Sequence, residues 1–280
     1  MKKYYFLILI SVVVFCSCDK IEGPFIADKQ TIDVDVEFPK LDPATVYRKV
    51  LLEEYTGQQC PNCPKGHEKA AELKVLYGDT LAIVAIHAGS FAAVDPQFPY
   101  DFTTTAGTQL YNDYAIGSFP AGIINRKPVS GGVGRTQWQN SIMEIDRSQI
   151  YAGIQLINKF DVATNILSIY SKTTMLKTYE NPLQLSFFLI EDGIISPQLK
   201  GTEIIQNYVH DHVLRLGING TYGERITPTG ILEKDSAYTI GYQLDFKGKD
   251  WNKNNCTVVA ILYDHKVKEV LQVETKKVIE

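Results

Sequence analysis

The chain of 280 residues lacks a basic excess, is poor in cysteine and has only one long apolar run. It holds 28 lysines and arginines against 32 acidic residues, for a net charge of −4. Phosphate contacts need a basic excess, so this balance argues against a nucleic-acid-binding protein. After the N-terminus no stretch is apolar enough to span a membrane. The hydrophobic fraction of 45% excludes a disordered chain and indicates a folded body.

The N-terminus has the pattern of an export signal. Two lysines precede an apolar run over residues 4–15, which is shorter than the ~20 residues that cross a bilayer. The run ends in Phe15-Cys16-Ser17-Cys18, which resembles a bacterial lipobox. We expect residues 1–17 to be a lipoprotein signal peptide and Cys18 to be lipidated, with Cys16 as the alternative. Residues 18–43 would then be a linker that holds the protein to a membrane of the cell envelope, facing the periplasm or the cell surface.

A Cys-x-x-Cys motif follows a predicted strand. Residues 50–55 are apolar enough for a buried strand, and the spacing after Cys60 is helical, so Cys60 and Cys63 are predicted at the start of a helix. A helix start stabilises a thiolate. Three interpretations stay open: a redox pair, a permanent disulfide suited to an oxidising location, and a metal site. Haem attachment is excluded, because Pro64 stands where a histidine is needed.

The order of elements around this motif resembles the thioredoxin family. A second apolar strand is predicted over residues 80–87, a helix over residues 104–114, and the segment Gly117-Ser118-Phe119-Pro120 is similar to the approach to the cis-proline of that family. The resemblance implies that Pro120 follows a cis bond and that Phe119 pairs with a bound peptide. It also implies that Glu54 is a buried proton relay, whereas Glu53 would be its solvated neighbour.

Two features depart from the thioredoxin pattern. Gln58 and Gln59 replace the usual aromatic environment before the first cysteine. Residues 88–102 are predicted to be an insertion that covers or shapes the site. The string VLLEEYTGQQCPNCPKGHEKAAEL, with IVAIHAG after it, is similar to a lipoprotein family called outer membrane protein 28. That resemblance implies an outer-membrane protein that acts as an adhesin, a receptor or another binding module.

The C-terminal half has the pattern of an antiparallel sandwich. A helix is predicted over residues 136–147, and short alternating runs follow at 154–160, 166–173, 183–191, 208–217, 237–246, 257–264 and 269–275. A strand is also predicted at residues 31–38 in the linker. His210 and His212 would share a face of one strand, which fits a solvent-facing pair better than a metal site. Cys256 is predicted to be a buried free thiol.

These patterns predict an α/β thioredoxin-like domain over residues 44–149, followed by an all-β, immunoglobulin-like sandwich domain over residues 150–280. Two functions remain open. In the first, Cys60 attacks a substrate disulfide, Cys63 resolves it, Glu54 relays protons, and Phe119 and Pro120 hold the peptide. In the second, the protein is a non-catalytic binding module and the cysteines form a structural disulfide. Neither function needs a separate cofactor or a metal, and the expected partners are the membrane, through the lipid anchor, and a protein or peptide.

Overall fold

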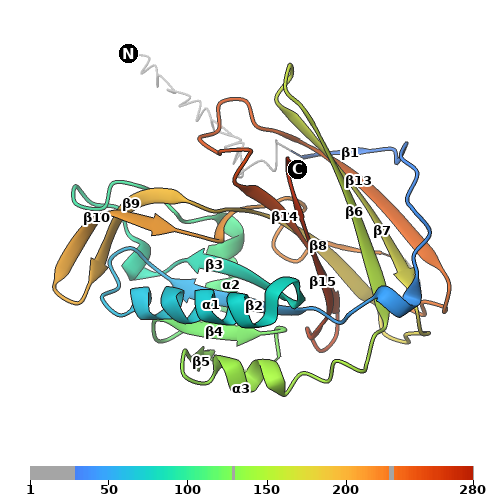
Figure 1. Cartoon of the computed structure of the whole chain (residues 1–280), viewed down its shortest axis with the longest axis horizontal. Coiled ribbons are helices and arrows are strands. Elements are labelled where there is room, and N and C mark those ends of the chain that lie inside the picture. The colour runs from blue at the N-terminus through green and yellow to red at the C-terminus, as the bar shows by residue number, and fades with distance from the viewer. Residues whose placement is uncertain (1–28, 128–129, 227–229, 280) are drawn as a thin grey trace, which may run out of the picture.

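The computed structural model describes residues 29–127, 130–226 and 230–279 (Figure 1). The helices in these ranges are α1 (Cys63–Tyr77), α2 (Thr105–Asp113) and α3 (Trp138–Met143), with short 3-10 turns at Pro43–Thr45, Gly78–Thr80 and Ser90–Ala92. None of the helices in the described ranges has the length and apolar character needed to cross a bilayer.

The largest sheet combines strands from both halves of the chain. Its order is β15-β14-β8-β11-β3-β2-β4-β5, and β12 pairs with β8. The strands are β2 (Val50–Thr56), β3 (Leu81–His87), β4 (Ala121–Ile124), β5 (Val133–Gly134), β8 (Leu183–Glu191), β11 (Val213–Gly217), β12 (Glu224–Arg225), β14 (Cys256–Asp264) and β15 (Val270–Lys277). The central strand β3 pairs in parallel with both β2 and β11. All its residues are buried, as expected for a strand covered on both faces.

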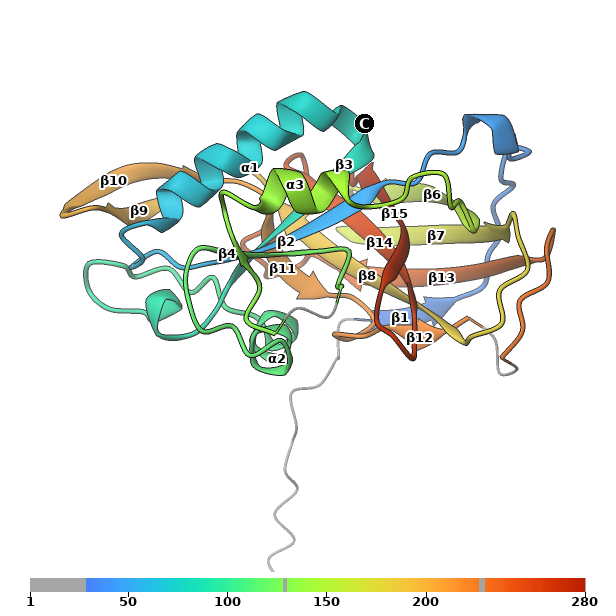
Figure 2. The same cartoon turned by 90° about the horizontal axis from the view of Figure 1, so that it is seen from below.

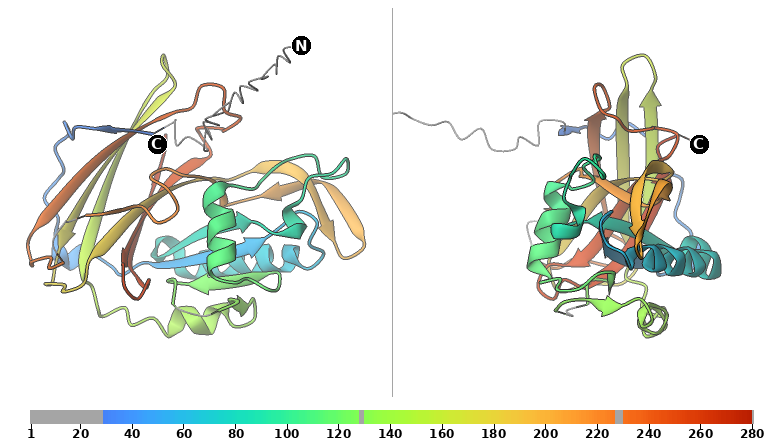
Figure 3. Two further views of the ribbon diagram at one scale, coloured as in Figure 1. Left: turned by 180° about the vertical axis from the view of Figure 1, so that it is seen from behind. Right: turned by 90° about the vertical axis from the view of Figure 1, so that its left-hand side faces the viewer.

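Two smaller sheets complete the structure. The four-stranded sheet has the order β1-β13-β7-β6, built from β1 (Lys29–Ile32), β6 (Ala152–Asp161), β7 (Ile166–Met175) and β13 (Ala237–Asp245). The two-stranded sheet is a hairpin of β9 (Ile194–Lys200) and β10 (Glu203–His210). Figures 1 and 3 show this hairpin at the end of the molecule opposite the four-stranded sheet.

The core is divided into layers by the large sheet. One face of its β8 and β14 region packs against the four-stranded sheet in a sandwich. Its other region, β2 to β4, is covered by α1 and α3 on one face and by α2 on the other, as Figure 2 shows. Along β2 the side chains alternate, so that Leu52 packs beneath α1 and α3 whereas Leu51 and Tyr55 pack on the α2 side.

The predicted fold class is wrong. The described residues form no separate thioredoxin-like α/β domain followed by an immunoglobulin-like sandwich. Instead β11, from the second half of the chain, pairs with β3 through Val213 and Ala85, so one mostly β structure runs through both halves. Alternation of apolar and polar residues predicts where strands occur, but it does not determine which strands pair in the sheet. The domain boundaries stay a prediction.

Several predicted elements are confirmed. Helix α2 covers Thr105–Asp113 and β8 covers Leu183–Glu191. The strand expected at residues 31–38 is mostly wrong, because β1 is Lys29–Ile32 and residues 33–38 are not in a strand. The helix expected over residues 136–147 is the shorter α3. The single strand expected over residues 208–217 is wrong, because the chain turns at His212, where φ is 58°, and separates β10 from β11. Strand β9 was not predicted.

Candidate functional site

The two cysteines lie at the junction of β2 and α1, as predicted. Cys60 precedes the helix, Cys63 is its first residue, and the two form a disulfide. Pro64 fits at the second helical position, where its missing N–H is not needed. Gly57 makes the tight turn before the motif possible, because a Cβ there would lie 2.5 Å from the carbonyl carbon of Phe91.

The disulfide is covered from two sides. Cys60 is 1% exposed and Cys63 is fully buried. On one side the segment of residues 88–102 lies over the turn, where Gln59 N–H donates to the Phe91 carbonyl at 2.9 Å. The amide of Gln58 donates to the Ala92 carbonyl at 3.1 Å.

The β9–β10 hairpin covers the other side of the disulfide. The buried amide of Gln198 donates to the carbonyl of Cys60 at 3.1 Å. The N–H of Leu199 donates to the carbonyl of Gln58 at 2.8 Å, and the N–H of Gly201 donates to the carbonyl of Pro61 at 2.9 Å. The loop that carries Cys60 is therefore fixed by residues almost 140 positions away in the sequence.

Glu54 lies beneath α1. Its side chain is 2% exposed, and burial raises its pKa to about 8. A Cβ on Gly66 would lie 2.7 Å from Glu54 Oε1 and 2.8 Å from Pro120 Cβ, so the carboxyl group and the proline both face this turn of the helix. The nearest ionisable partner is His67, whose Nε2 is 3.8 Å from Glu54 Oε1. The expected burial of Glu54 is present, whereas its role as a relay stays a prediction.

The bond between Phe119 and Pro120 is cis, which is the conformation that the sequence resemblance implies. The ring of Phe119 packs against Phe91 and Tyr111, with centroids 5.6 and 5.9 Å apart. Part of the predicted peptide-binding position therefore contacts the covering segment of residues 88–102. The binding role of Phe119 and Pro120 stays a prediction.

A cluster of histidines beside Glu54 was not predicted. The ring of His210 lies 6.2 Å from that of His67 and 5.4 Å from that of His87, and Phe102 stacks on His87 at 4.4 Å. Burial lowers the pKa of all three histidines. The sequence singled out His210 by its HxH pattern, but the β9–β10 hairpin is what places His210 beside His67 and His87.

The expected shared face of His210 and His212 is absent, because His212 lies in the turn after β10, where its Nδ1 is 3.0 Å from Asp192 Oδ1. In the parts of the chain that the structure describes, no group of three or more His, Cys, Asp or Glu side chains is placed to hold a metal ion. Cys256 is a buried free thiol, as predicted.

Glu53 is not the solvated neighbour that the sequence suggested. It is fully buried and binds Arg126, whose Nη2 donates to Glu53 Oε1 at 2.8 Å and whose Nε donates at 3.0 Å. The guanidinium also lies 5.1 Å from the ring centroid of Tyr263 and 5.6 Å from that of Phe188. This pair connects β2 to strands of the second half.

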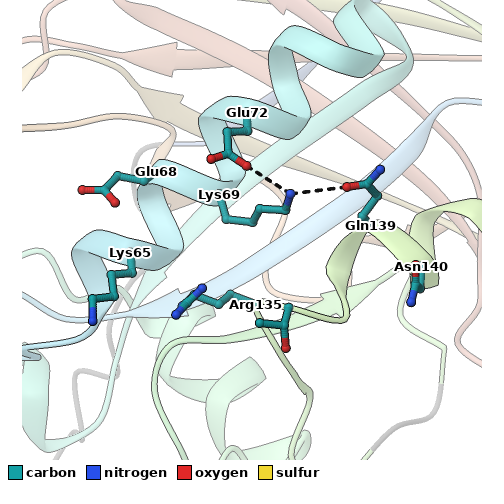
Figure 4. A pocket seen from close by; sticks show the side chains of 8 residues that line it. Lys65, Glu68, Lys69, Glu72, Arg135, Gln139 and Asn140 are labelled. Carbon is teal, nitrogen blue, oxygen red and sulfur yellow. Dashed lines mark hydrogen bonds and ion pairs between the residues drawn. The ribbon is translucent and has the colours of Figure 1, made fainter.

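Cys18 and Cys16 lie outside the described residues. A separate surface hollow of about 520 Å³ lies between α1 and α3 (Figure 4). In it Lys69 Nζ donates to Glu72 Oε2 at 3.0 Å and to Gln139 Oε1 at 3.3 Å. None of the predicted site residues lines it.

Solved structures resemble this fold at low sequence identity. HBP35 of Porphyromonas gingivalis superposes with a TM-score of 0.64 at 16% identity, over 83% of this chain and 76% of that chain. Protein AGR_C_4864 from Agrobacterium tumefaciens superposes with a TM-score of 0.52 at 13% identity, over 84% of this chain and 97% of that chain. A domain of the outer membrane lipoprotein Omp28 from P. gingivalis has 21% identity over 46% of this chain and 88% of that chain, with a TM-score of 0.32.

No curated protein matches the sequence. The family model described as outer membrane protein Omp28 matches residues 107–280, which is more than half of the chain. The matched part begins well after the disulfide. Family membership therefore rests on a part of the chain that excludes Cys60 and Cys63. The chain belongs to the outer membrane protein Omp28 family, which assigns it to the outer membrane of the cell envelope.

Proposed function

We propose that this protein is a lipid-anchored outer-membrane protein that binds a partner, and that Cys60–Cys63 is a structural disulfide. One observation carries the proposal, namely the burial of both cysteines beneath the segment of residues 88–102 and the β9–β10 hairpin. Exchange begins when a thiolate attacks a disulfide sulfur, so the attacked atom must be accessible. A buried disulfide held by backbone hydrogen bonds resists this attack.

The hairpin supports the binding role. Ile195 and Val209 are cross-strand partners and are 65% and 50% exposed. An exposed apolar pair on a projecting hairpin is available for contact with a partner. The disulfide then serves to fix the loop on which the hairpin rests.

The competing function is thiol–disulfide exchange, with Cys60 as nucleophile, Cys63 as resolving thiol, and Glu54 as relay. The raised pKa of Glu54 and its position beneath α1 favour it. A reduction experiment separates the two functions. The full-length Cys256→Ser protein, purified in detergent, is incubated with dithiothreitol at increasing urea concentration, and the peptide holding residues 60–63 is analysed for alkylation.

For a structural disulfide we expect reduction only at urea concentrations that unfold the protein. Rapid reduction of the native protein, with insulin reduction that Cys60→Ser abolishes, contradicts the proposal and supports exchange. The free thiol of Cys256 is removed in this experiment because it could attack the disulfide once the protein unfolds.

The lipid anchor is proposed at Cys18. Cells grown with an alkyne-labelled fatty acid should incorporate the label into the natural protein and into Cys16→Ala, but not into Cys18→Ala. Incorporation into Cys18→Ala that is lost in Cys16→Ala places the anchor at Cys16 instead. The covalent lipid holds the protein at the membrane because each buried methylene adds about 0.8 kcal/mol.

A further inference from the structure

A small cavity lies between α1 and the end of β10, and it shares Glu54 and His67 with the site described above. Its volume is about 230 Å³, and the residues of interest in its lining are Glu54, His67, Glu68, Tyr208 and Asp211. Binding sites for drug-sized ligands span about 300–1,000 Å³, so this cavity suits only a small chemical group.

The floor of the cavity holds a buried acceptor without a donor. Glu54 is 2% exposed, and its Oε1 atom has no hydrogen-bond partner among the residues that the structure describes. The neighbouring His67 is engaged elsewhere, because its Nε2 is 2.8 Å from the Thr56 hydroxyl and its Nδ1 is 2.8 Å from the Tyr208 hydroxyl. Buried polar atoms in folded proteins are nearly always paired, so an unpaired carboxyl oxygen that lines a cavity indicates a missing donor.

The charges around the cavity select the kind of donor. The other carboxylates that line it belong to Glu68 and Asp211, and no lysine or arginine is among its described lining residues. Lys200 does not line the cavity, but its Nζ lies 2.8 Å from Glu68 Oε1. Burial lowers the pKa of His67, and likewise of His210 behind it, so these rings are neutral at pH 7. His212 lies at the rim, where it faces Asp192 at 3.0 Å.

We propose that this cavity binds a primary ammonium group on a short alkyl chain, with Glu54 as its counter-ion. An ammonium has three donors and no acceptor, which matches the unpaired oxygen of Glu54 and the hydroxyl of Tyr208. The group is the end of a lysine side chain of a partner protein or the end of a free diamine. This inference rests on the proposed function, because it names a ligand chemistry for a protein that binds rather than catalyses.

Binding transfers one proton to solvent. Burial raises the pKa of Glu54 to about 8, so at pH 7 the empty site holds a neutral carboxyl group. The ammonium keeps its own protons, and Glu54 loses one when the ion pair forms. Affinity is therefore expected to rise by up to about tenfold per pH unit between pH 6 and pH 8, where Glu54 would otherwise be protonated.

The test is calorimetric titration of the full-length protein in detergent with two probes, 1,4-diaminobutane and Nα-acetyl-lysine methylamide. Titrations at pH 7 in phosphate and in Tris, which differ in ionisation enthalpy, measure proton release. We expect binding with release of close to one proton, and a loss of affinity of at least about tenfold in Glu54→Gln, because the ion pair is lost. Glu72→Gln is the control, since Glu72 lies on α1, which lines the cavity, but does not itself line it.

Tighter binding of the lysine derivative identifies a protein partner as the source of the group, and tighter binding of the diamine identifies a free amine. Absence of binding by both probes at millimolar concentration, or equal affinity in Glu54→Gln, overturns the inference. If Glu54→Gln does not fold, Glu54→Asp tests the same point, because it keeps the charge and should bind more weakly with the same proton release. The disulfide experiment is separate, so either proposal can fail without the other.

Discussion

Two neighbouring glutamates on β2 occupy opposite faces of the sheet and have different partners. Glu53 faces the α2 side and is fixed by Arg126, whereas Glu54 faces α1 and has no arginine or lysine beside it in the described part of the chain. Burial of a carboxyl group favours its neutral form, and a close cation or hydrogen bonds donated to the carboxylate offset that effect. The sequence Glu53-Glu54 therefore contains one buried ion pair and one buried acid.

Removal of the buried ion pair should destabilise the whole protein. For Arg126→Met we expect the free energy of unfolding to fall by about 3–5 kcal/mol, because Glu53 is left buried without a partner. Urea denaturation followed by circular dichroism measures this loss. Lys200→Met removes an exposed pair with Glu68 and should change the free energy by less than about 1 kcal/mol. Equal effects of the two substitutions contradict this account of Arg126.

The raised pKa of Glu54 has a consequence for the pH dependence of stability. Between its ordinary value of 4.5 and about 8, the folded protein keeps a proton on Glu54 that the unfolded chain loses, so this group's contribution falls as pH rises. Glu54→Gln stays neutral. Its stability relative to the natural protein should therefore increase from pH 5 to pH 8, by at most about 1.4 kcal/mol per pH unit.

Urea denaturation of both proteins at several pH values in this range provides the measurement. The buried histidines have lowered pKa values and contribute the opposite slope below pH 6.5, but they are present in both proteins and cancel in the difference. Glu72→Gln, on the surface of α1, should show no such trend. A difference between Glu54→Gln and the natural protein that does not change with pH means that Glu54 titrates normally.

At the scale of elements, the turn between β2 and α1 is the part most constrained by its surroundings. Its backbone carbonyls accept hydrogen bonds from the β9–β10 hairpin, and the Gln59 N–H and the Gln58 side-chain amide donate to the segment of residues 88–102. Three segments far apart in sequence thus meet around one disulfide. The close approach of the turn to Phe91 requires glycine at position 57.

Gly57→Ala should be destabilising although it adds only a methyl group. The new Cβ would lie 2.5 Å from both the carbonyl carbon and oxygen of Phe91, and backbone atoms cannot rotate away. Overpacking of this kind costs about 1–3 kcal/mol, which thermal or urea unfolding measures. Gly117→Ala is the control, because its Cβ would meet no atom within 4 Å. A loss no larger than that of Gly117→Ala shows that the segment of residues 88–102 moves freely.

For the whole molecule, the large sheet is continuous and contains strands from both halves of the chain. Strand β11 pairs with β3 and with β8, so it lies between strands of the first half and strands of the second. Arg126 adds a contact of the same kind through Phe188 and Tyr263. Neither half can lose its strands without exposing an edge of the other.

We therefore expect both halves to unfold in one transition. The chain has two tryptophans, with Trp138 in α3 and Trp251 in the loop before β14. Urea unfolding of Trp138→Phe and Trp251→Phe, each followed by the fluorescence of the remaining tryptophan, should give midpoints that coincide after correction for the stability of each variant. Two separated transitions in the natural protein contradict this expectation and indicate two independent domains.

The sequence alone determined the local features of this protein. Period and composition were enough to find β3, β8 and α2 and to locate the cysteine pair at a strand-to-helix junction, and the string around that pair resembles the Omp28 family. These features depend on residues that are near each other in the chain, so they leave a readable pattern.

Only the tertiary structure decided what surrounds the cysteines and how the sheets join. The cover of the disulfide comes from β9 and from residues 88–102, the partner of Glu53 is Arg126, and β11 is the neighbour of β3. Each of these contacts joins segments distant in sequence, and many partners would satisfy the same local pattern. The choice among them is made by long-range packing and burial of charge, because only in the folded chain does each unpaired edge or carboxyl group meet its counterpart.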